Sequence, residues 1–382
     1  MPYWRLSAWY FFYFAFIGAF SPYFALYLQS LAFNAWDISV LLSLMQVMRL
    51  VAPNLWGWLA DGLGDKTRIV RVAAAMSVVG FIGFFFTTSF SGLFLSMVFM
   101  SFFWSASLPL VEALTLGHLE RHAERYGAIR MWGSVGFIIA VTGIGWLLDA
   151  WPIAALLWVA VALLAGILAC ALVLPATRRK QSDLPALELI ATLRRPKVFS
   201  LLLASFLMSA AHGPLYVFYS IHLVDHGYGK TVVGALWSLG VLAEILVFLV
   251  MPRLLRRYSL QHLLMFSFAC AIVRFLVIGW AADSILLLSA AQLLHGATFG
   301  VCHAATVAAL HRWFPGGQQA RAQALYGSIS FGAGGMLGAL ASGQTWEAFG
   351  PGWTYTLGSL FALAGLLLVW RGNAERPAPE TV

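Results

Sequence analysis

The sequence has very little charge. Only 10% of its 382 residues are Asp, Glu, Lys or Arg, whereas 61% are hydrophobic, and soluble globular proteins carry roughly 25% charged residues. A chain so poor in charge does not stay dissolved in water with this much apolar surface. We therefore expect lipid to solvate most of it, which excludes an ordinary soluble protein.

Cysteine and recognisable catalytic motifs are also scarce. Cys170, Cys270 and Cys302 lie in apolar runs, and their spacing suits neither zinc nor a disulfide framework. No HExxH, EF-hand or dinucleotide fingerprint is present, and Gly229-Lys230-Thr231 lacks the first glycine of a phosphate loop, where Val224 stands. We expect no enzyme activity, no metal and no cofactor, and a proton gradient in place of ATP as the energy source.

The basic residues sit in short clusters between apolar runs, which is typical of membrane topology signals rather than of nucleic-acid binding. About 20 apolar residues cross a bilayer as a helix. We predict twelve such spans near 5–30, 36–60, 69–88, 92–116, 126–148, 152–174, 198–223, 231–251, 259–281, 284–308, 320–345 and 350–371. The first run is too long for a signal peptide, so we interpret it as a retained span.

The positive charges predict the orientation. With both termini in the cytoplasm, Lys230 is the only Lys or Arg that faces outward. The outer loops then carry acids, namely Asp37, Asp149, Asp225, Asp283 and Glu347. We predict an all-α, multi-pass protein of a bacterial inner membrane. A polar linker at 175–197 separates two pseudo-symmetric six-helix bundles, 1–174 and 198–382, as in transporters built from parallel repeats.

Two charged residues stand near one end of the fourth and fifth spans. Glu112 and Arg130 face each other across the predicted antiparallel hairpin if these helices extend beyond the hydrocarbon. A contact between them would lower the cost of burying each. The alternative is that both side chains snorkel to the interface. Ionisable residues inside a membrane are functional candidates by default.

Other ionisable residues lie deeper. Arg49, Glu244 and Arg274 are roughly 20 Å from a helix start, at 1.5 Å per residue, too deep for easy snorkelling. Glu244 and Arg274 suit either a structural ion pair or a proton-linked site. His295 and His303 are eight residues apart, near one helix face, and with His212 they suit a proton relay or satisfied core positions.

The buried charges also suggest a substrate. Three buried arginines against two glutamates leave an excess of positive charge that an anionic substrate would neutralise. Aromatic side chains near these charges can stack on a substrate ring, or belong to the core or interface belts. They are Trp132, Tyr216, Tyr219, Trp237 and Tyr326.

Several motifs carry a family resemblance. The stretch Gly57-Trp58-Leu59-Ala60-Asp61, followed by Gly64 and Lys66, resembles the loop 2–3 signature of the major facilitator superfamily. The resemblance implies the twelve-helix fold and a conformational gate at Gly57, Asp61, Gly64 and Lys66. Gly62 and Asp65 depart from the signature, since basic residues are usual there.

A second resemblance concerns the charged pair. Val111-Glu112-Ala113, then Arg130-Met131 and Gly133-x-x-Gly136, resembles the lactose permease branch. It implies that Arg130 is a bidentate donor to substrate and Glu112 an acceptor. In that branch a glutamate follows the span-10 histidine by one turn, whereas Thr298 stands there in this chain.

Longer fragments are similar to the bacterial 3-phenylpropionate (hydrocinnamate) transporter group. They are YGAIRMWGSVGF (126–137), AAHGPLYVFYSIH (210–222), ALWSLGVLAEI (235–245) and QLLHGATFGVCHAA (292–305). In that group the glutamate, the arginine and both histidines of spans 8 to 10 recur.

We therefore expect a monomeric, proton-coupled symporter that imports a small organic anion, an aromatic carboxylate, by alternating access. The alternatives are a sugar or nucleoside symporter and a proton-driven drug efflux antiporter. A membrane-embedded hydrolase using Ser134, Ser238 and the histidines has no motif in its favour, and a receptor without transport would not need the buried Glu244. The expected partners are the substrate, protons and membrane lipid.

Overall fold

The computed structural model describes residues 2–63, 65–119, 125–175, 195–314 and 318–372. Most of the predicted linker 175–197, and Gly64 of the predicted gate, lie outside these ranges. The first half of the described chain contains α1 (Tyr3–Ser30), α2 (Ala35–Leu63), α3 (Lys66–Ile82), η1 (Gly83–Phe85), α4 (Phe90–Leu119), α5 (Tyr126–Ala150) and α6 (Ala155–Val173). The second contains α8 (Pro196–Ala211), α9 (Gly213–Asp225), α10 (Lys230–Arg257), α11 (Leu260–Trp280), α12 (Ile285–Leu293), η3 (Gly296–Val301), α13 (Cys302–Trp313), α14 (Gln318–Gly327), η4 (Ser328–Gly334), α15 (Gly335–Phe349) and α16 (Pro351–Gly372).

Within the described ranges, twelve helical segments are long and apolar enough to cross a membrane, and they match the twelve predicted spans. The predicted all-helical organisation is confirmed. Some spans are composite: one runs from Pro196 to Asp225, and another from Ile285 to Trp313 through η3. Both η3 and η4 are π-helical, which the hydrophobic pattern does not predict.

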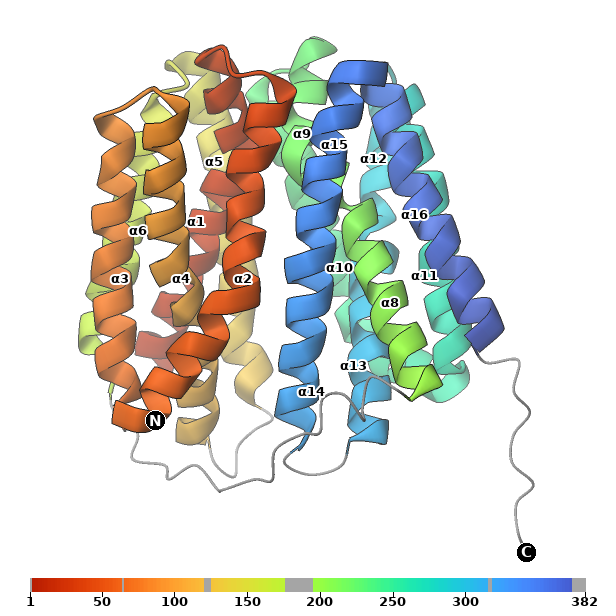
Figure 1. Ribbon diagram of the computed structural model, residues 1–382, viewed down its shortest axis with the longest axis horizontal. Coiled ribbons are helices and arrows are strands. Elements are labelled where there is room, and N and C mark those ends of the chain that lie inside the picture. Colours follow the sequence, from red (N-terminus) through yellow and green to blue (C-terminus); the bar gives the residue numbers. More distant parts are fainter. Residues whose placement is uncertain (1, 64, 120–124, 176–194, 315–317, 373–382) are drawn as a thin grey trace, which may run out of the picture. The chain divides into compact units, whose positions relative to one another are not determined.

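The chain divides into two compact units. Unit 1 is Met1–Ser182 with Leu215–Ser238 and Ser342–Glu347, and unit 2 is Asp183–Pro214, Leu239–Ala341 and Ala348–Val382. The predicted halves differ from this division by the two short segments that unit 1 takes from the second half of the sequence. Figure 1 shows α1–α6 and α8–α16 in sequence colours.

Unit 1 is built around α1, which packs against α5 and α6. Its core is aromatic: Tyr13 stacks on Trp104 with ring centroids 4.7 Å apart and on Trp9 at 4.8 Å. A second group of rings is at most 2% exposed to solvent. It consists of Phe16, Phe20, Phe24, Phe81 and Phe84. Since rings bury large areas and stack in offset geometry, this core holds α1, α3 and α4 together.

Glycines let α1 and α5 approach closely. A Cβ on Gly136 would lie 2.2 Å from the carbonyl oxygen of Phe11, and one on Gly18 would lie 2.6 Å from that of Phe137. In lipid, where tails are as apolar as the helices, association relies on such close packing of small residues. This contact fixes α5, and therefore Arg130, against α1.

Asp149 anchors the first turn of α10 within unit 1. Its carboxylate accepts hydrogen bonds from the backbone N–H of Lys230 (2.7 Å) and Thr231 (2.9 Å) and from the Thr231 hydroxyl (2.6 Å), and Lys230 Nζ lies 4.0 Å away. Gly229, which precedes the helix, has no side chain to satisfy these N–H groups, so Asp149 of α5 supplies the acceptor instead.

Neighbouring contacts extend this junction. The Tyr23 hydroxyl lies 2.7 Å from the carbonyl oxygen of Val141 and 3.2 Å from that of Lys230, and Thr142 bonds to Ser238 at 2.8 Å. These contacts explain why Leu215–Ser238 groups with the first half of the chain.

Unit 2 is organised around α11, which packs against α12, α13, η3 and α16, while α8 packs against α16 and η4. The α8 contacts are again close: a Cβ on Gly334 would lie 2.4 Å from the carbonyl oxygen of Phe206, and one on Gly338 would lie 2.3 Å from that of Ala210. Small residues thus bring the η4 and α15 backbone onto α8.

We predict that Gly136→Ala lowers the thermal midpoint of the purified protein, because the new methyl group collides with the Phe11 backbone, which cannot move aside as a side chain does. Gly143→Ala on the same helix is the matched control. Nothing lies within 4 Å of a Cβ there, so only the better helix propensity of alanine, about 0.5–1 kcal/mol, should act. Equal midpoints for the two variants would contradict the close approach.

Candidate functional site

The acidic member of the first predicted pair is held by tyrosines. Glu112 lies in α4, half-buried, and the Tyr126 hydroxyl at the start of α5 donates to its Oε1 at 3.2 Å. Tyr10 of α1 reaches the next turn of α4, where its hydroxyl lies 3.3 Å from that of Thr115. Three helices therefore meet around this carboxylate, which keeps acceptor capacity because Tyr126 occupies only part of it.

Arg130 is held by aromatic rings. Its guanidinium carbon lies 3.8 Å from the centroid of Phe14 and 5.8 Å from that of Tyr10, both on α1. A guanidinium over a ring gains from the negative face of the π-system. Gly133 makes room for this arrangement, since a Cβ there would meet Phe14 at 2.7 Å and Arg130 Nη1 at 2.8 Å.

The two charges are neighbours but not a salt bridge. Glu112 and Arg130 lie within electrostatic range, yet among the described residues no carboxylate oxygen lies within 4.0 Å of the Arg130 guanidinium. The predicted direct contact is thus replaced by Tyr126 on one side and Phe14 on the other. The N–H groups of Arg130 are left with donor capacity for a ligand.

The other predicted residues of unit 1 have different partners. Arg49 is half-buried in α2, within electrostatic range of Tyr13. Trp132 donates its indole N–H to Tyr3 (3.1 Å) and packs edge-on against Trp4. Trp132 therefore contacts the first turn of α1, two turns before Tyr10.

Tyr216 and Trp237 do lie together. Their rings stack with centroids 6.1 Å apart, Tyr219 meets Trp237 edge-on at 5.8 Å, and the Trp237 indole donates to Ser220 at 3.3 Å. Trp237 and Tyr219 are almost fully buried. Within unit 1, this group is a packed aromatic contact between α9 and α10.

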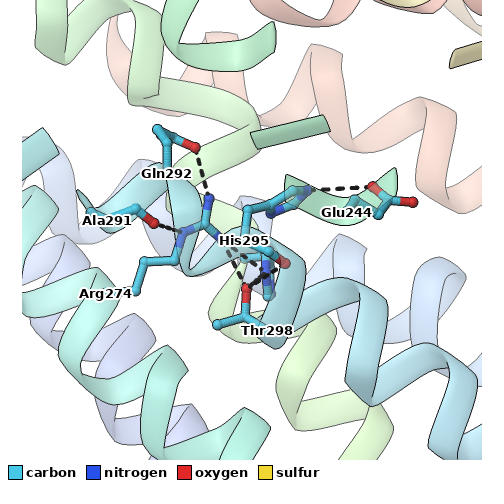
Figure 2. Close-up of polar contacts among 7 residues, drawn as sticks. Glu244, Arg274, Ala291, Gln292, His295 and Thr298 are labelled. Atoms are coloured by element: carbon cyan, nitrogen blue, oxygen red, sulfur yellow. Dashed lines mark hydrogen bonds and ion pairs between the residues drawn. The ribbon is translucent and has the colours of Figure 1, made fainter. Parts of the chain in front are cut away.

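The charged residues of unit 2 form a network around Arg274, which is completely buried. Its guanidinium donates to the Ala291 carbonyl (3.0 Å), to Gln292 Oε1 (3.1 Å) and to Thr298 Oγ1 (3.1 Å), and it lies 3.3 Å from His212 Nε2. Figure 2 shows Ala291 and Gln292 of α12 and Thr298 of η3 around the guanidinium. Gln292 and Ala291 are partners that a search for charged side chains misses.

The hydrogen bonds assign the state of His212. Its Nδ1 lies 2.8 Å from the Met208 carbonyl oxygen, which only accepts, so Nδ1 carries the proton. Its Nε2 faces the donating Arg274 guanidinium and therefore carries the lone pair. In this arrangement His212 is thus a neutral tautomer whose Nε2 accepts a hydrogen bond from Arg274.

Glu244 pairs with His295: Oε2 of Glu244 lies 3.8 Å from Nε2 of His295. Glycines bring the two helices together. A Cβ on Gly296 would lie 2.7 Å from the Ala243 carbonyl oxygen, and one on Gly300 would meet Val247 and Glu244 at 3.2 and 3.6 Å. The π-helical segment η3 therefore rests directly on α10 at Glu244. The sequence shows these glycines but not what they contact.

His303 and Tyr326 are also brought together, with His303 Nδ1 3.0 Å from the Tyr326 hydroxyl. Phe299 lies between the two histidines, at 5.6 Å from the His295 ring and 6.0 Å from the His303 ring. The prediction that both histidines share one face is confirmed, and Phe299 is a neighbour that the sequence analysis missed.

The predicted gate is described in part. A Cβ on Gly57 would meet no atom within 4 Å, so a close approach is not formed at this glycine. Lys66 begins α3, and Asp65 caps that helix by accepting from the Arg68 N–H at 3.0 Å. Asp65, which departs from the family signature, thus has a local structural role. The side chain of Asp61 lies outside the described atoms.

The model of the "MFS_1 like family" matches residues 3–357. The chain belongs to this family. It is therefore a secondary transporter of the major facilitator type, and its relatives are transporters rather than enzymes.

Individual relatives differ in what they carry. The chain is 30% identical to the "Probable 3-phenylpropionic acid transporter" of Escherichia coli (strain K12), covering 94% of this chain and 95% of that protein. It is 27% identical to the "Maltose permease" of Geobacillus stearothermophilus, covering 97% and 95%. The solved structure of nucleoside transporter NupG shares the fold with a TM-score of 0.86 at 18% identity, covering 98% and 100%.

We predict that Arg274→Lys lowers the thermal midpoint well below that of Arg253→Lys, an exposed control in α10. A lysine cannot reach the acceptors that the planar guanidinium serves, and each buried acceptor left unsatisfied costs about 1–3 kcal/mol. If the midpoints of the two variants agree, the network around Arg274 does not stabilise unit 2.

Proposed function

We propose that this transporter is a proton-coupled symporter that imports a small aromatic carboxylate of the 3-phenylpropionate class. The observation that carries the proposal is the state of Arg130. Its guanidinium is half-buried and stacked on Phe14, with no carboxylate within 4.0 Å among the described residues. A half-buried cation without a direct ion pair is costly, and a carboxylate substrate offsets that cost.

The chemistry of the site suits a carboxylate. A guanidinium presents parallel N–H donors that match the two oxygens of a carboxylate, and such bidentate bonds are both stronger and more directional than neutral ones. Phe14 covers one face of Arg130 and so leaves its edges for the ligand. The similarity to a phenylpropionic acid transporter supports the same substrate class.

We place the coupling proton on Glu244 and His295. His212 accepts from Arg274 through Nε2, whereas Glu244 and His295 face each other at 3.8 Å. Protonation of either group changes their mutual attraction, which lets one proton bias the conformation of the α10–η3 contact. Arg274 organises this pair as a positioning residue.

A neutral sugar or nucleoside is the second candidate. Glu112 accepts from Tyr126 and retains acceptor capacity for a hydroxyl, and the maltose permease is similar over nearly the whole chain. The proposal also includes the direction of transport, an inner-membrane location with both termini in the cytoplasm, and a monomeric state. A proton-driven drug efflux antiporter, the remaining alternative, would use the same fold but export its substrate in exchange for protons.

Proteoliposomes test the substrate class and the coupling. With an acidic exterior and an alkaline interior, we expect protein-dependent accumulation of labelled 3-phenylpropionate that a protonophore abolishes. Because weak acids cross bilayers unaided, protein-free liposomes under the same gradient give the background to subtract. Accumulation of maltose or uridine, without accumulation of the acid, would favour the second candidate. Uptake that does not depend on the pH gradient would contradict proton coupling.

We predict that Glu244→Gln keeps exchange of substrate across the membrane but loses gradient-driven accumulation.

Arg130→Lys tests the carboxylate site. We predict that this variant loses at least tenfold in kcat/KM for 3-phenylpropionate, because lysine lacks the planar pair of donors. Its thermal midpoint should change little, since Arg130 makes no salt bridge within the described part of the chain. Arg253→Lys should leave uptake unchanged. A fully active Arg130→Lys variant would show that this residue is only an interfacial anchor.

A further inference from the structure

Glu112 lies beside the proposed substrate arginine of unit 1. Tyr126 and Arg130 are one turn apart on α5, so their side chains share one face of that helix, with about 5–6 Å between Cβ atoms. Tyr126 donates to Glu112 Oε1 at 3.2 Å. This bond places the carboxylate next to Arg130, which acts on it electrostatically without a salt bridge in the described part of the chain.

Tyr10 of α1 contacts both sides of the same arrangement. Its ring centroid lies 5.8 Å from the guanidinium carbon of Arg130, and its hydroxyl lies 3.3 Å from that of Thr115. Thr115 follows Glu112 by three residues on α4 and therefore shares its face. The contacts of Tyr126 and of Tyr10 thus agree that Glu112 and Arg130 are neighbours.

A substrate carboxylate on Arg130 brings a second negative charge next to Glu112. When two carboxylates share a site, one of them holds a proton much more tightly than an isolated acid does. The substrate stays ionised because both of its oxygens accept from the guanidinium. Glu112 does not need a charge for its bond with Tyr126, since a protonated carboxyl group still accepts at its carbonyl oxygen. The proton therefore goes to Glu112.

Glu112 is also the acid of this neighbourhood. Among the described side chains, the ionisable groups that act on it or on its neighbours are Tyr10 and Tyr13 of α1, Tyr126 and Arg130 of α5, and Arg49 of α2. Arg71 of α3 donates instead to the Ala171 and Leu174 carbonyl oxygens, and His118 of α4 bonds to that of Leu114. A phenol ordinarily ionises near pH 10, so the tyrosines of this set stay neutral while Glu112 can change its charge.

We propose that Glu112 binds a proton whenever a substrate carboxylate binds Arg130, so that unit 1 takes up the anion and a proton together. This inference rests on the proposed function and adds a second proton to it. The proton on Glu112 neutralises the charge of the substrate, whereas the proton on Glu244 and His295 biases the conformation. Two protons then accompany one monovalent anion, and each transport cycle moves one net positive charge inward.

The membrane potential tests the number of protons. Symport of one proton with a monovalent anion is electroneutral, whereas symport of two protons responds to voltage. Proteoliposomes with equal pH on both sides receive an inside-negative potential from a potassium gradient and valinomycin, and protein-dependent uptake of labelled 3-phenylpropionate is measured. Movement of one net charge changes the accumulation ratio about tenfold for every ~60 mV. We expect this response from the wild-type protein, and uptake by Glu112→Gln that is the same with and without the potential.

Binding to the purified protein tests the linkage without transport. The dissociation constant of 3-phenylpropionate is measured between about pH 6 and pH 9, where a free acid with a pKa of about 4–5 is ionised. If binding takes up a proton, the dissociation constant rises by up to about tenfold per pH unit where Glu112 is ionised in the free protein. Glu112→Gln should lose this slope. Since Glu244 and His295 are present in both proteins, the difference between them is due to Glu112.

Two control variants accompany these measurements. Glu347→Gln makes the same substitution at an exposed glutamate of α15 and should leave the voltage response and the pH slope as in the wild type. Glu112→Asp keeps the acid and should keep the voltage response.

Two results would overturn the inference. One is wild-type uptake that is driven by a pH gradient but ignores the membrane potential, and the other is a Glu112→Gln variant that binds with the wild-type pH slope. Either result leaves the proposed function standing. If the wild-type protein takes up no 3-phenylpropionate under either gradient, the proposed function itself is wrong and the second proton falls with it.

Discussion

A hydrocarbon solvent offers no hydrogen bonds, and the completely buried guanidinium of Arg274 is where this constraint acts most strongly. Every N–H group that the protein leaves unserved there carries a desolvation cost. The guanidinium bonds to groups from two other spans, at His212 in one and at Ala291, Gln292 and Thr298 in the other. One side chain thereby fixes α11 against the α8–α9 junction and against α12 and η3. The position of His295, and through it the contact with Glu244, follows from this arrangement.

The same constraint gives two arginines opposite roles. Arg274 is saturated by neutral acceptors, so adding a ligand there would require breaking bonds that already exist. Arg130 rests on Phe14, and its stacking uses the face of the guanidinium rather than its N–H groups. The bonds of Arg274 support the structure, whereas Arg130 is the arginine that, in our proposal, meets the substrate. In the sequence the two residues look alike, because each is a single cation in an apolar run.

The positions of the buried charges can be predicted from the sequence, but their hydrogen-bond partners cannot. The twelve spans are predictable because bilayer thickness demands about 20 apolar residues per helix, and the neighbourhood of Glu112 and Arg130 follows from a hairpin between adjacent spans. The direct partners do not follow. Which side chains contact Glu112 and Arg130 depends on how α5 is rotated against α1, and that rotation depends on the close approach at Gly136. Tyr126 and Phe14 are the residues that result. Asp149 and Lys230 are recognisable as outer-loop charges, yet 81 residues separate them and only the fold shows that one caps the helix of the other.

The π-helical segments mark the limit of pattern-based prediction, and they also explain the shape of the unit 2 site. The two glycines of Gly296–Val301 weaken an α-helix, but glycine alone does not identify a π-helix. Their geometry arises because Gly296 and Gly300 let η3 settle on α10, at Ala243 and Glu244. The wider turn then aligns His295, Phe299 and His303, which an ideal α-helix would fan apart. Proximity to a carboxylate and alignment of rings are thus two results of one backbone distortion, because η3 carries both the contact of His295 with Glu244 and the stack of His295, Phe299 and His303.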